Sequence, residues 1–146
     1  MPPGAILVED RVEAAQVAEL VALLAGTWLS PGRTEDVVRR MLTGSAVVLA
    51  ALDDAGRLVG FARVLTDRVC LALVLDVVVA EDRRGTGVGA ALMDAVVAHP
   101  DVAAAASVEL VCQPELRGFY RRWGFTDEVG RSGLMRRTEV PGLLGR

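Results

Sequence analysis

The sequence contains no lysine, because arginine supplies all 16 of its basic residues. The absence of lysine excludes a Walker A phosphate loop, a Schiff-base enzyme and a Ser–Lys catalytic dyad. Aromatic residues make up only 4% of the chain, and the formal net charge is -3. This composition disfavours a nucleic-acid-binding protein, because it provides few rings for base stacking and no excess of positive charge.

Cysteine and histidine are also scarce, and Cys70, Cys112 and His99 are the complete set. They form no CxxC motif and no close Cys–His pair, so we expect no metal site and no Cys–His nucleophile. The N-terminus lacks the basic stretch and long apolar run of a signal peptide. The apolar run from Cys70 to Ala80 is interrupted by Asp76 and is too short to cross a bilayer. We therefore expect a cytoplasmic protein with reduced thiols and no membrane partner.

The length of 146 residues is typical of one domain, here 1–146, and 52% of the residues are apolar, which is enough for a core. Hydrophobic periodicity and turn residues predict the element order β-α-α-β-β-β-α-β-α-β-β. Hairpins in the middle of this order and helical crossovers near its end predict an α+β fold, in which about four helices cover a mixed sheet.

The predicted strands are apolar runs bounded by turn residues: 5–8, 46–52, 58–65, 69–79, 108–112, 125–129 and 133–137. The predicted helices, 12–25, 34–44, 87–98 and 114–123, have apolar residues at helical spacing. Thr34 is a typical N-cap, Pro114 suits a first helical turn, and residues 53–56 are typical of a hairpin turn.

A glycine-rich turn follows the longest apolar strand and has the sequence Arg84-Gly85-Thr86-Gly87-Val88-Gly89-Ala90. The first N–H groups of a helix have no intrahelical partner and favour an anion. Glycine lets the backbone approach a phosphate closely, and Arg84 adds a charged, bidentate donor. The turn therefore predicts a phosphate-binding site.

Two other interpretations of this turn stay open. Gly85-x-Gly87-x-x-Ala90 fits a loose dinucleotide-binding pattern, and Glu109 follows at about the required 20 residues. However, Glu109 lies near the start of its strand, and the chain lacks room for a second mononucleotide-binding half. A purely structural turn is disfavoured, because three alternating glycines weaken a helix start without a packing benefit.

Two motifs carry a resemblance to a known family. Arg84-x-x-Gly87-x-Gly89, after a valine-rich strand, resembles the acetyl-CoA pyrophosphate motif of the GNAT superfamily of N-acetyltransferases. The segment 118–125, with the sequence GFYRRWGF, is similar to a later helix motif of that superfamily. One helix and one strand separate the motifs, as they do in the superfamily, and the resemblance extends over residues 59–125.

The resemblance implies a mostly antiparallel sheet that is splayed between its fourth and fifth strands, here 69–79 and 108–112. Acetyl-CoA would lie in the opening, and a bulge in the fourth strand would aim an N–H at the thioester carbonyl, where it would stabilise the oxyanion. Many members have an asparagine at the position of Gln113. The implied cofactor-binding residues are Val77, Val78, Val79, Arg84, Gly85, Thr86, Gly87, Val88, Gly89, Ala90 and Arg122.

Tyr120, the only tyrosine, is by this resemblance the general acid that protonates the CoA thiolate, and core packing is its alternative role. Asp76 interrupts an apolar strand, where a carboxylate is costly unless it is paired or faces a cavity. Asp76 would bind or help to deprotonate the acceptor ammonium, or form an ion pair with Arg63 or Arg68. Arg122 has the alternative of a solvated helix face. Three further residues would cover the acceptor site or simply pack: Trp28, Arg33 and Glu35.

The resemblance thus implies an acetyl-CoA-dependent N-acetyltransferase that moves the acetyl group directly to a primary amine, without a metal. The acceptor stays open between a small amine, an amino acid, an antibiotic, and a protein N-terminus or side-chain amine. A homodimer stays open as well. The alternative function is a non-catalytic acetyl-CoA-binding sensor or subunit with the same fold.

Overall fold

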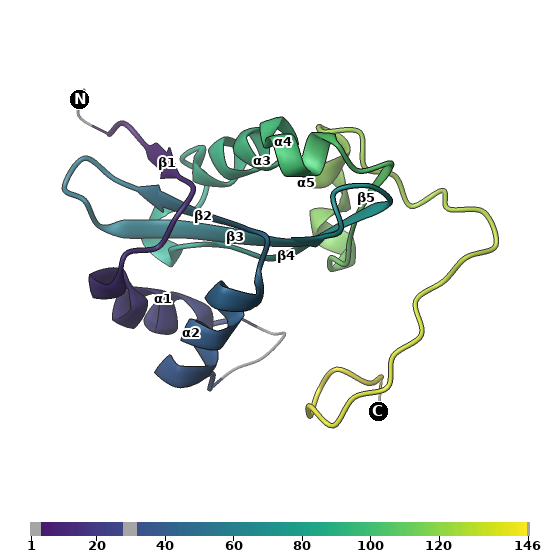
Figure 1. Cartoon of the computed structure of the whole chain (residues 1–146), viewed down its shortest axis with the longest axis horizontal. Coiled ribbons are helices and arrows are strands. Elements are labelled where there is room, and N and C mark those ends of the chain that lie inside the picture. Colours follow the sequence, from purple (N-terminus) through teal and green to yellow (C-terminus); the bar gives the residue numbers. More distant parts are fainter. Residues whose placement is uncertain (1–3, 28–31, 146) are drawn as a thin grey trace.

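A five-stranded sheet in the order β1-β2-β3-β4-β5 is the middle layer of the protein, and helices cover both of its faces (Figure 1). The structure is a computed structural model that describes residues 4–27 and 32–145. The strands are β1 (Leu7–Glu9), β2 (Val47–Leu52), β3 (Leu58–Thr66), β4 (Leu71–Val79) and β5 (Ser107–Leu110). The helices within these described ranges are α1 (Val17–Ala25), α2 (Glu35–Gly44), α3 (Val88–Ala98), α4 (Pro100–Ala103) and α5 (Arg117–Arg121). Three short 3-10 turns precede α1, α3 and α5.

The sheet is mixed and mostly antiparallel, as the sequence predicted. Among the described strands, neighbours from β1 to β4 run antiparallel, and β4 and β5 run parallel. A parallel pair needs a crossover connection, and α3 and α4 provide it. The α+β fold class is therefore confirmed.

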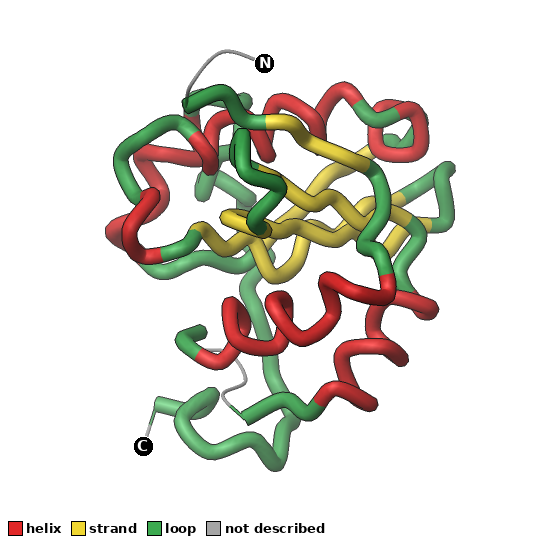
Figure 2. Tube along the Cα trace, turned by 90° about the vertical axis from the view of Figure 1, so that its left-hand side faces the viewer, coloured by secondary structure: helices red, strands yellow, loops and turns green. Residues whose placement is uncertain are grey.

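Each face of the sheet buries its own apolar core, and Figure 2 shows the strands between two layers of helices. On one face, Leu20 of α1 and Val38 of α2 are buried with Phe61 of β3. On the other face, Leu92 and Val96 of α3 are buried against β2, β3 and β4. This two-sided burial explains why β2, β3 and β4 are nearly continuous apolar runs instead of alternating ones.

Gly60 of β3 lets α3 lie close to the sheet. A Cβ at this position would stand 2.8 Å from Val88 Cγ1 and 2.9 Å from Leu92 Cδ1, distances that real Cβ atoms essentially never show. A side chain at Gly60 would therefore push the N-terminal half of α3 away from the sheet. That half of the helix follows the glycine-rich turn directly. The packing at Gly60 therefore also affects how far the turn lies from the sheet.

Local capping interactions agree with the sequence prediction at two places. Thr34 caps α2, and its side chain accepts a hydrogen bond of 3.2 Å from the Val37 N–H. Asp53 shapes the β2–β3 turn, because its Oδ1 accepts from the N–H groups of Ala55 and Arg57 at 3.0 and 2.9 Å. Both interactions satisfy backbone donors that a helix start or a turn leaves without partners.

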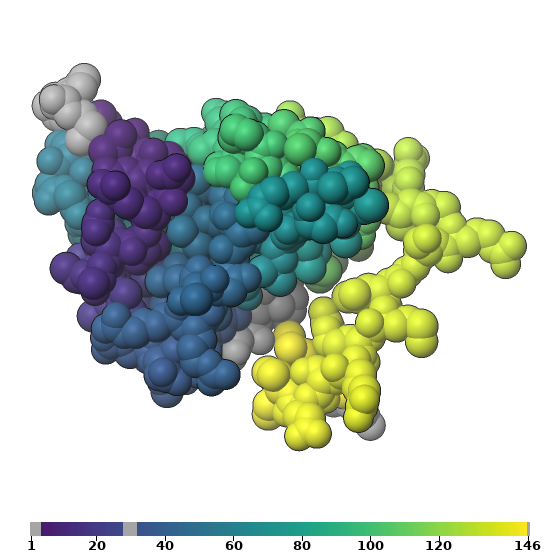
Figure 3. Space-filling view, viewed as in Figure 1, coloured from purple at the N-terminus to yellow at the C-terminus, as the bar shows by residue number. Residues whose placement is uncertain are grey.

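The prediction of a final pair of strands, 125–129 and 133–137, is wrong. No strand follows β5 among the described residues, and the segment after α5 runs away from the body of the protein (Figure 3). Phe125 still packs against the core, but beyond it Val129, Leu134 and Met135 are 55%, 63% and 95% accessible. An isolated hairpin is only marginally stable in water, and β5 has only four residues with which a further strand could pair. The local alternation of apolar and polar residues was therefore not enough to form strands.

Smaller differences concern the ends of elements. The predicted helix 12–25 is a 3-10 turn followed by α1, and the predicted helix 114–123 is a 3-10 turn followed by α5. Pro100 ends α3 as expected, but it also begins α4, where His99 Nδ1 accepts from the Asp101 N–H at 3.1 Å. Within the described ranges, no helix is long and apolar enough to cross a membrane.

Candidate active site

The sheet opens between β4 and β5. The two strands pair only from Leu71 with Ser107 to Val74 with Leu110. Beyond Val74, β4 continues to Val79 and pairs with β3 alone among the described residues. One backbone edge of residues 75–79 therefore has no strand partner among the described residues, and the predicted splay is confirmed.

A β-bulge in β4 lies directly beside this opening. Phe61 pairs with Val78 and Arg63 pairs with Leu75, so two steps along β3 correspond to three along β4. Asp76 takes up the extra residue with φ of 53°, in the left-handed region. The resemblance implied a bulge in this strand, and the structure has one.

The bulge shifts by one residue the alternation that decides which face of the sheet each side chain of β4 points to. Before it, Ala72 and Val74 belong to the α3 side; after it, Val77 and Val79 do. Strict alternation would have placed Asp76 in that same apolar core. The bulge instead sends the Asp76 carboxylate toward the α2 side, where a charged group finds partners.

The glycine-rich turn forms the start of α3. Gly85 and Gly87 have φ values of 76° and 93°, and Gly87 is the N-cap of the helix. No side chain within the described ranges caps α3, and a Cβ at Gly87 would meet no atom within 4 Å. The first N–H groups of α3 thus border open space, which is the environment that a phosphate needs.

The turn, α5 and the open edge of β4 adjoin one another at Gly89. A Cβ at this position would stand 3.2 Å from Phe119 Cζ of α5 and 3.7 Å from Val79 Cγ2 of β4. The two sequence motifs, which lie about thirty residues apart, therefore meet beside the end of β4. Of the predicted phosphate-binding residues, Arg84, Gly85, Thr86 and Gly87 are exposed, whereas Val88 is buried in the core.

Two ion pairs fasten the glycine-rich turn to the β2–β3 hairpin. Arg83 Nη2 lies 2.8 Å from Oδ2 of the buried Asp53, and Arg57 binds Asp82 through two bonds of 2.9 and 3.0 Å. The hydrogen bond from Arg57 lowers the pKa of Asp82 below its ordinary value. Sequence reasoning missed both pairs, because the partners are 25 and 30 residues apart with no periodicity to connect them.

These contacts predict that Asp53 positions the turn. We expect Asp53→Asn to lower the free energy of unfolding by about 1–3 kcal/mol, because it removes a charge-assisted bond from a buried site. Because the resemblance implies that this turn binds acetyl-CoA, we also expect a severalfold weaker affinity for acetyl-CoA in calorimetry. Asp54→Asn, at the exposed neighbouring position, is the matched control. Equal acetyl-CoA affinity in both variants would show that the ion pair does not position the turn.

Tyr120 lies in the apolar core on the α3 side and is 7% exposed. Its ring packs edge-on against Phe119 at 5.1 Å and Phe125 at 6.1 Å between centroids. Burial raises the pKa of Tyr120 to about 12, with a smaller contribution from Cys112. Burial also raises the pKa of the Cys112 thiol. The surroundings of Tyr120 thus favour both a neutral phenol and a neutral thiol.

Arg122 is the exposed C-cap residue of α5. Its guanidinium is 4.8 Å from the centroid of Trp123 and 5.6 Å from that of Phe119. Trp123 in turn donates to Asp94 Oδ1 of α3 at 2.8 Å. These contacts hold α5 against α3 and leave Arg122 at the surface near Gly89. A phosphate contact by Arg122 stays a prediction. Gln113 ends the stretch after β5 and precedes the 3-10 turn at Pro114.

Asp76 is held by two arginines. Arg63 Nε lies 2.5 Å from its Oδ2, and Arg33 Nη1 lies 3.1 Å from its Oδ1. Of the two ion-pair partners that the sequence left open, Arg63 is present. Arg68 instead lies 3.1 Å from Asp101. The Arg33 contact was not predicted, since the two residues are far apart in the sequence.

Two other residues were expected to cover the acceptor site. Glu35 forms an exposed ion pair with Arg39, one helical turn farther along α2. Trp28 lies outside the described residues. Of the two described members of this set, Arg33 therefore lies at the bulge and Glu35 does not.

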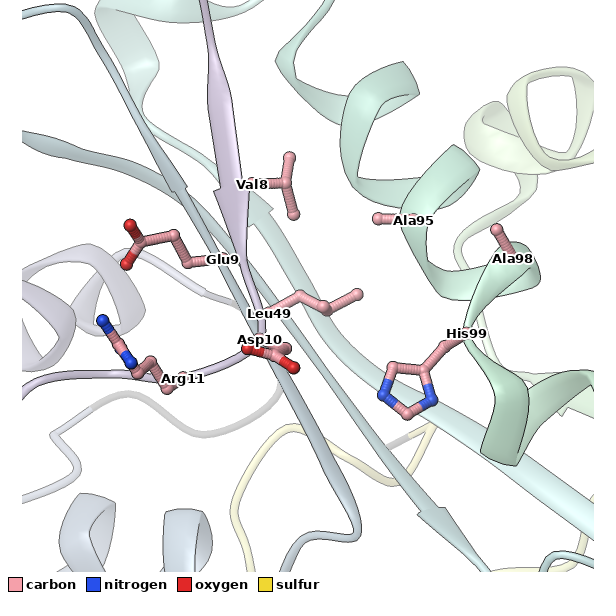
Figure 4. A pocket seen from close by; sticks show the side chains of 8 residues that line it. All are labelled: Val8, Glu9, Asp10, Arg11, Leu49, Ala95, Ala98 and His99. Atoms are coloured by element: carbon pink, nitrogen blue, oxygen red, sulfur yellow. The ribbon is translucent and has the colours of Figure 1, made fainter.

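A separate pocket of about 480 Å³ lies between β1, β2 and the C-terminal end of α3 (Figure 4). None of the predicted site residues lines it. Its lining is Val8, Glu9, Asp10, Arg11, Leu49, Ala95, Ala98 and His99. The glycine-rich turn is at the other end of α3, roughly 16 Å away at 1.5 Å per residue. Substitutions in this pocket therefore serve as controls for substitutions at the bulge.

A mixed sheet that opens between β4 and β5, with a glycine-rich helix start beside the opening, defines a GNAT-like fold. A family model described as an acetyltransferase (GNAT) domain matches residues 16–135. The chain therefore belongs to the GNAT family of acetyltransferases. The fold also excludes the dinucleotide-binding interpretation, because its sheet contains only one parallel pair among the described strands.

Relatives of the chain include two named plant enzymes. Serotonin N-acetyltransferase 2, chloroplastic, of Oryza sativa is 41% identical over 98 residues, which are 65% of this chain and 49% of that protein. Glucosamine 6-phosphate N-acetyltransferase 1 of the same species is 34% identical over 118 residues, 72% of each chain. The chain thus spans about half the length of the first of these relatives.

A solved structure extends the likeness over the whole chain. A protein from Xanthomonas campestris pv. campestris that is assigned to the GNAT family matches with a TM-score of 0.80 at 31% identity. The match covers 99% of this chain and 100% of that one.

Proposed function

We propose that the chain transfers an acetyl group from acetyl-CoA to a primary amine. The observation that carries the proposal is the meeting of three features at one place. The unpaired edge of β4 and the uncapped start of α3 lie beside the opening in the sheet, and Tyr120 is buried in the same apolar cluster as Val77 and Val79 of that strand. The naming of relatives as N-acetyltransferases supports the same reaction.

Acetyl-CoA would be bound through the amide groups of its pantetheine arm and through its pyrophosphate. The pantetheine amides would pair with the free edge of Val77, Val78 and Val79, and the pyrophosphate would accept from the first N–H groups of α3 and from Arg84. This placement directs the thioester toward the bulge. An N–H of the bulged strand would then stabilise the oxyanion that forms on the carbonyl.

The reaction balances as a direct transfer. The amine nitrogen attacks the thioester carbonyl, the carbon–sulfur bond breaks, and Tyr120 gives its proton to the leaving sulfur. The nitrogen loses one proton as the amide forms, and that proton restores the phenol through solvent. The products are the N-acetyl amide and the free thiol of CoA. The reaction as written needs no metal ion.

The release of free thiol from acetyl-CoA across a panel of amines tests this function. We expect turnover with at least one primary amine, and the mass of the product should increase by one acetyl group. Binding of acetyl-CoA without turnover on any amine would instead support the sensor or subunit alternative. A preference for a nicotinamide dinucleotide over CoA would contradict the donor assignment.

Asp76→Asn separates the two roles that the sequence left open for Asp76. Its carboxylate is the counter-charge of two nearly buried arginines, so we expect a loss of roughly 3 kcal/mol in the free energy of unfolding. The measurement is denaturant unfolding of the variant and the natural chain. An ammonium-binding role predicts a different result, namely a higher KM for every amine acceptor at unchanged stability. That second result would return Asp76 to the acceptor-binding residues.

A further inference from the structure

The ion pairs at the bulge form a cluster with excess positive charge. This basic cluster consists of Arg33, Arg63 and Asp76, two cations and one anion. Its side chains are 12%, 15% and 2% exposed, respectively. A net charge of one unit is thus held in a poorly solvated place, where an unpaired charge is costly. A bound anion would neutralise the cluster.

The two guanidinium groups have unused hydrogen-bond donors. Arg63 uses Nε for Asp76 and Nη1 for a long bond of 3.4 Å to Ser45 Oγ. Arg33 Nη1 forms the ion pair with Asp76 and donates a hydrogen bond only to the weak acceptor Met41 Sδ, at 3.5 Å, among the described residues. Within residues 4–27 and 32–145, neither Nη2 group has a hydrogen-bond partner, and no unpartnered side-chain nitrogen is fully buried. These donors therefore reach the protein surface.

The basic cluster lies on the side of β4 that the proposed donor does not use. Tyr120 and the side chains of Val77 and Val79 belong to the α3 side of the sheet. Arg33 contacts Met41 of α2, and Arg63 contacts Ser45 at the end of α2. An acceptor that approaches the bulge from the α2 side would meet these arginines next to the reacting carbonyl.

We propose that the acceptor carries an oxyanion, a carboxylate or a phosphate, in addition to its amine, and that Arg33 and Arg63 bind this oxyanion. The inference rests on the proposed acetyl transfer and specifies its substrate class. Arginine is suited to binding an oxyanion, because its planar guanidinium group can donate two parallel hydrogen bonds to one carboxylate or phosphate. Asp76 is then a positioning residue that orients both guanidinium groups. A polycationic acceptor is disfavoured, because the cluster would repel it.

Matched pairs of amines test the inference by turnover. Phenylalanine is compared with phenylethylamine, and glucosamine 6-phosphate with glucosamine, so that carboxylate and phosphate are tested separately. We expect kcat/KM to be about 10- to 100-fold higher for the acidic member of at least one pair, mainly through KM. Equal values within both pairs, or a preference for the neutral members, would overturn the proposal.

Arginine variants assign the effect to the basic cluster. We expect Arg33→Gln to bring the ratio of kcat/KM between the acidic and the neutral member of a pair close to one. Arg33→Lys keeps the positive charge but loses the bidentate guanidinium group, so its preference for the acidic acceptor should be intermediate. Arg39→Gln, on the exposed face of α2, is the matched control and should have no effect. The proposal is wrong if Arg33→Gln lowers kcat/KM equally for both members of a pair.

A binding measurement keeps the inference testable if no amine in the panel is acetylated. Inorganic phosphate and acetate are titrated into the protein after CoA has been added to saturation, so that the glycine-rich turn is already filled. At least one of the two anions should bind to the natural chain and not to Arg33→Gln. Absence of binding by both anions would overturn the inference, whereas absence of turnover alone would count against the proposed function.

Discussion

Tyr120→Phe should lower kcat by about 10²–10⁴, the usual contribution of a general acid, with little change in acetyl-CoA affinity. The substitution keeps the ring, so the contacts of Tyr120 with Phe119 and Phe125 persist. It removes only the hydroxyl, the one group of this ring that can protonate a leaving thiolate. Steady-state kinetics with saturating amine, together with calorimetric binding of acetyl-CoA, measure both quantities. A variant with the natural kcat would show that solvent protonates the thiolate.

The ionisation of Tyr120 gives an independent check, because the chain has no other tyrosine. Its pKa is about 12 in the folded protein, against an ordinary value of 10.0. Between these values the unfolded chain binds fewer protons than the folded one, so the free energy of unfolding should fall as pH rises from 10 to 12. Absorbance of the tyrosinate follows the titration directly. Tyr120→Phe should show a smaller fall, to which the Cys112 thiol with its raised pKa still contributes, whereas a fall of equal size in the variant would assign it wholly to other groups.

Gly87→Val should abolish acetyl-CoA binding while the protein stays folded. The position borders open space at the start of α3, where a side chain would occupy the place of the pyrophosphate. Loss of two charge-assisted hydrogen bonds costs about 3–6 kcal/mol of binding free energy. Calorimetry gives the affinity, and circular dichroism shows whether the helices persist.

Backbone strain at Gly87 needs its own control, since φ is 93° there. Gly142, in the C-terminal segment, has φ of 84°, and a Cβ at that position would likewise meet no atom within 4 Å. Gly142→Val thus carries similar strain outside the glycine-rich turn and the hairpin that is fastened to it. Loss of acetyl-CoA affinity in Gly87→Val but not in Gly142→Val assigns the effect to the phosphate position. Parallel loss in both variants would indicate a general effect of strain.

The elements that the sequence predicted correctly are those that local pattern determines. β2, β3 and β4 are long apolar runs, α3 has apolar residues at helical spacing after a glycine N-cap, and α2 follows its N-cap Thr34. The bulge and the splay followed from the family resemblance, and the register of β4 confirms both. The signals for the helices and strands lie within about fifteen residues, the range over which periodicity and capping act.

The features that the sequence did not predict depend on distant partners. Asp53 was recognised as a turn residue, but its ion pair with Arg83 joins two loops that only the folded sheet brings together. Arg33 reaches Asp76 in the same way. Residues 125–137 were wrongly predicted as strands for the same reason. Their alternation of apolar and polar residues is a local pattern, whereas a strand also requires a neighbouring strand to pair with. Pattern alone cannot supply these contacts.

The single extra residue at Asp76 also bears on how such a protein diversifies. Under the proposed function, one strand serves the donor from its α3 side and the acceptor from its α2 side. Arg33 precedes α2 in a loop and contributes nothing to the glycine-rich turn or to Tyr120. A lineage with this fold can therefore exchange the residues around α2, and so move to new amines, while the acetyl-CoA machinery stays intact.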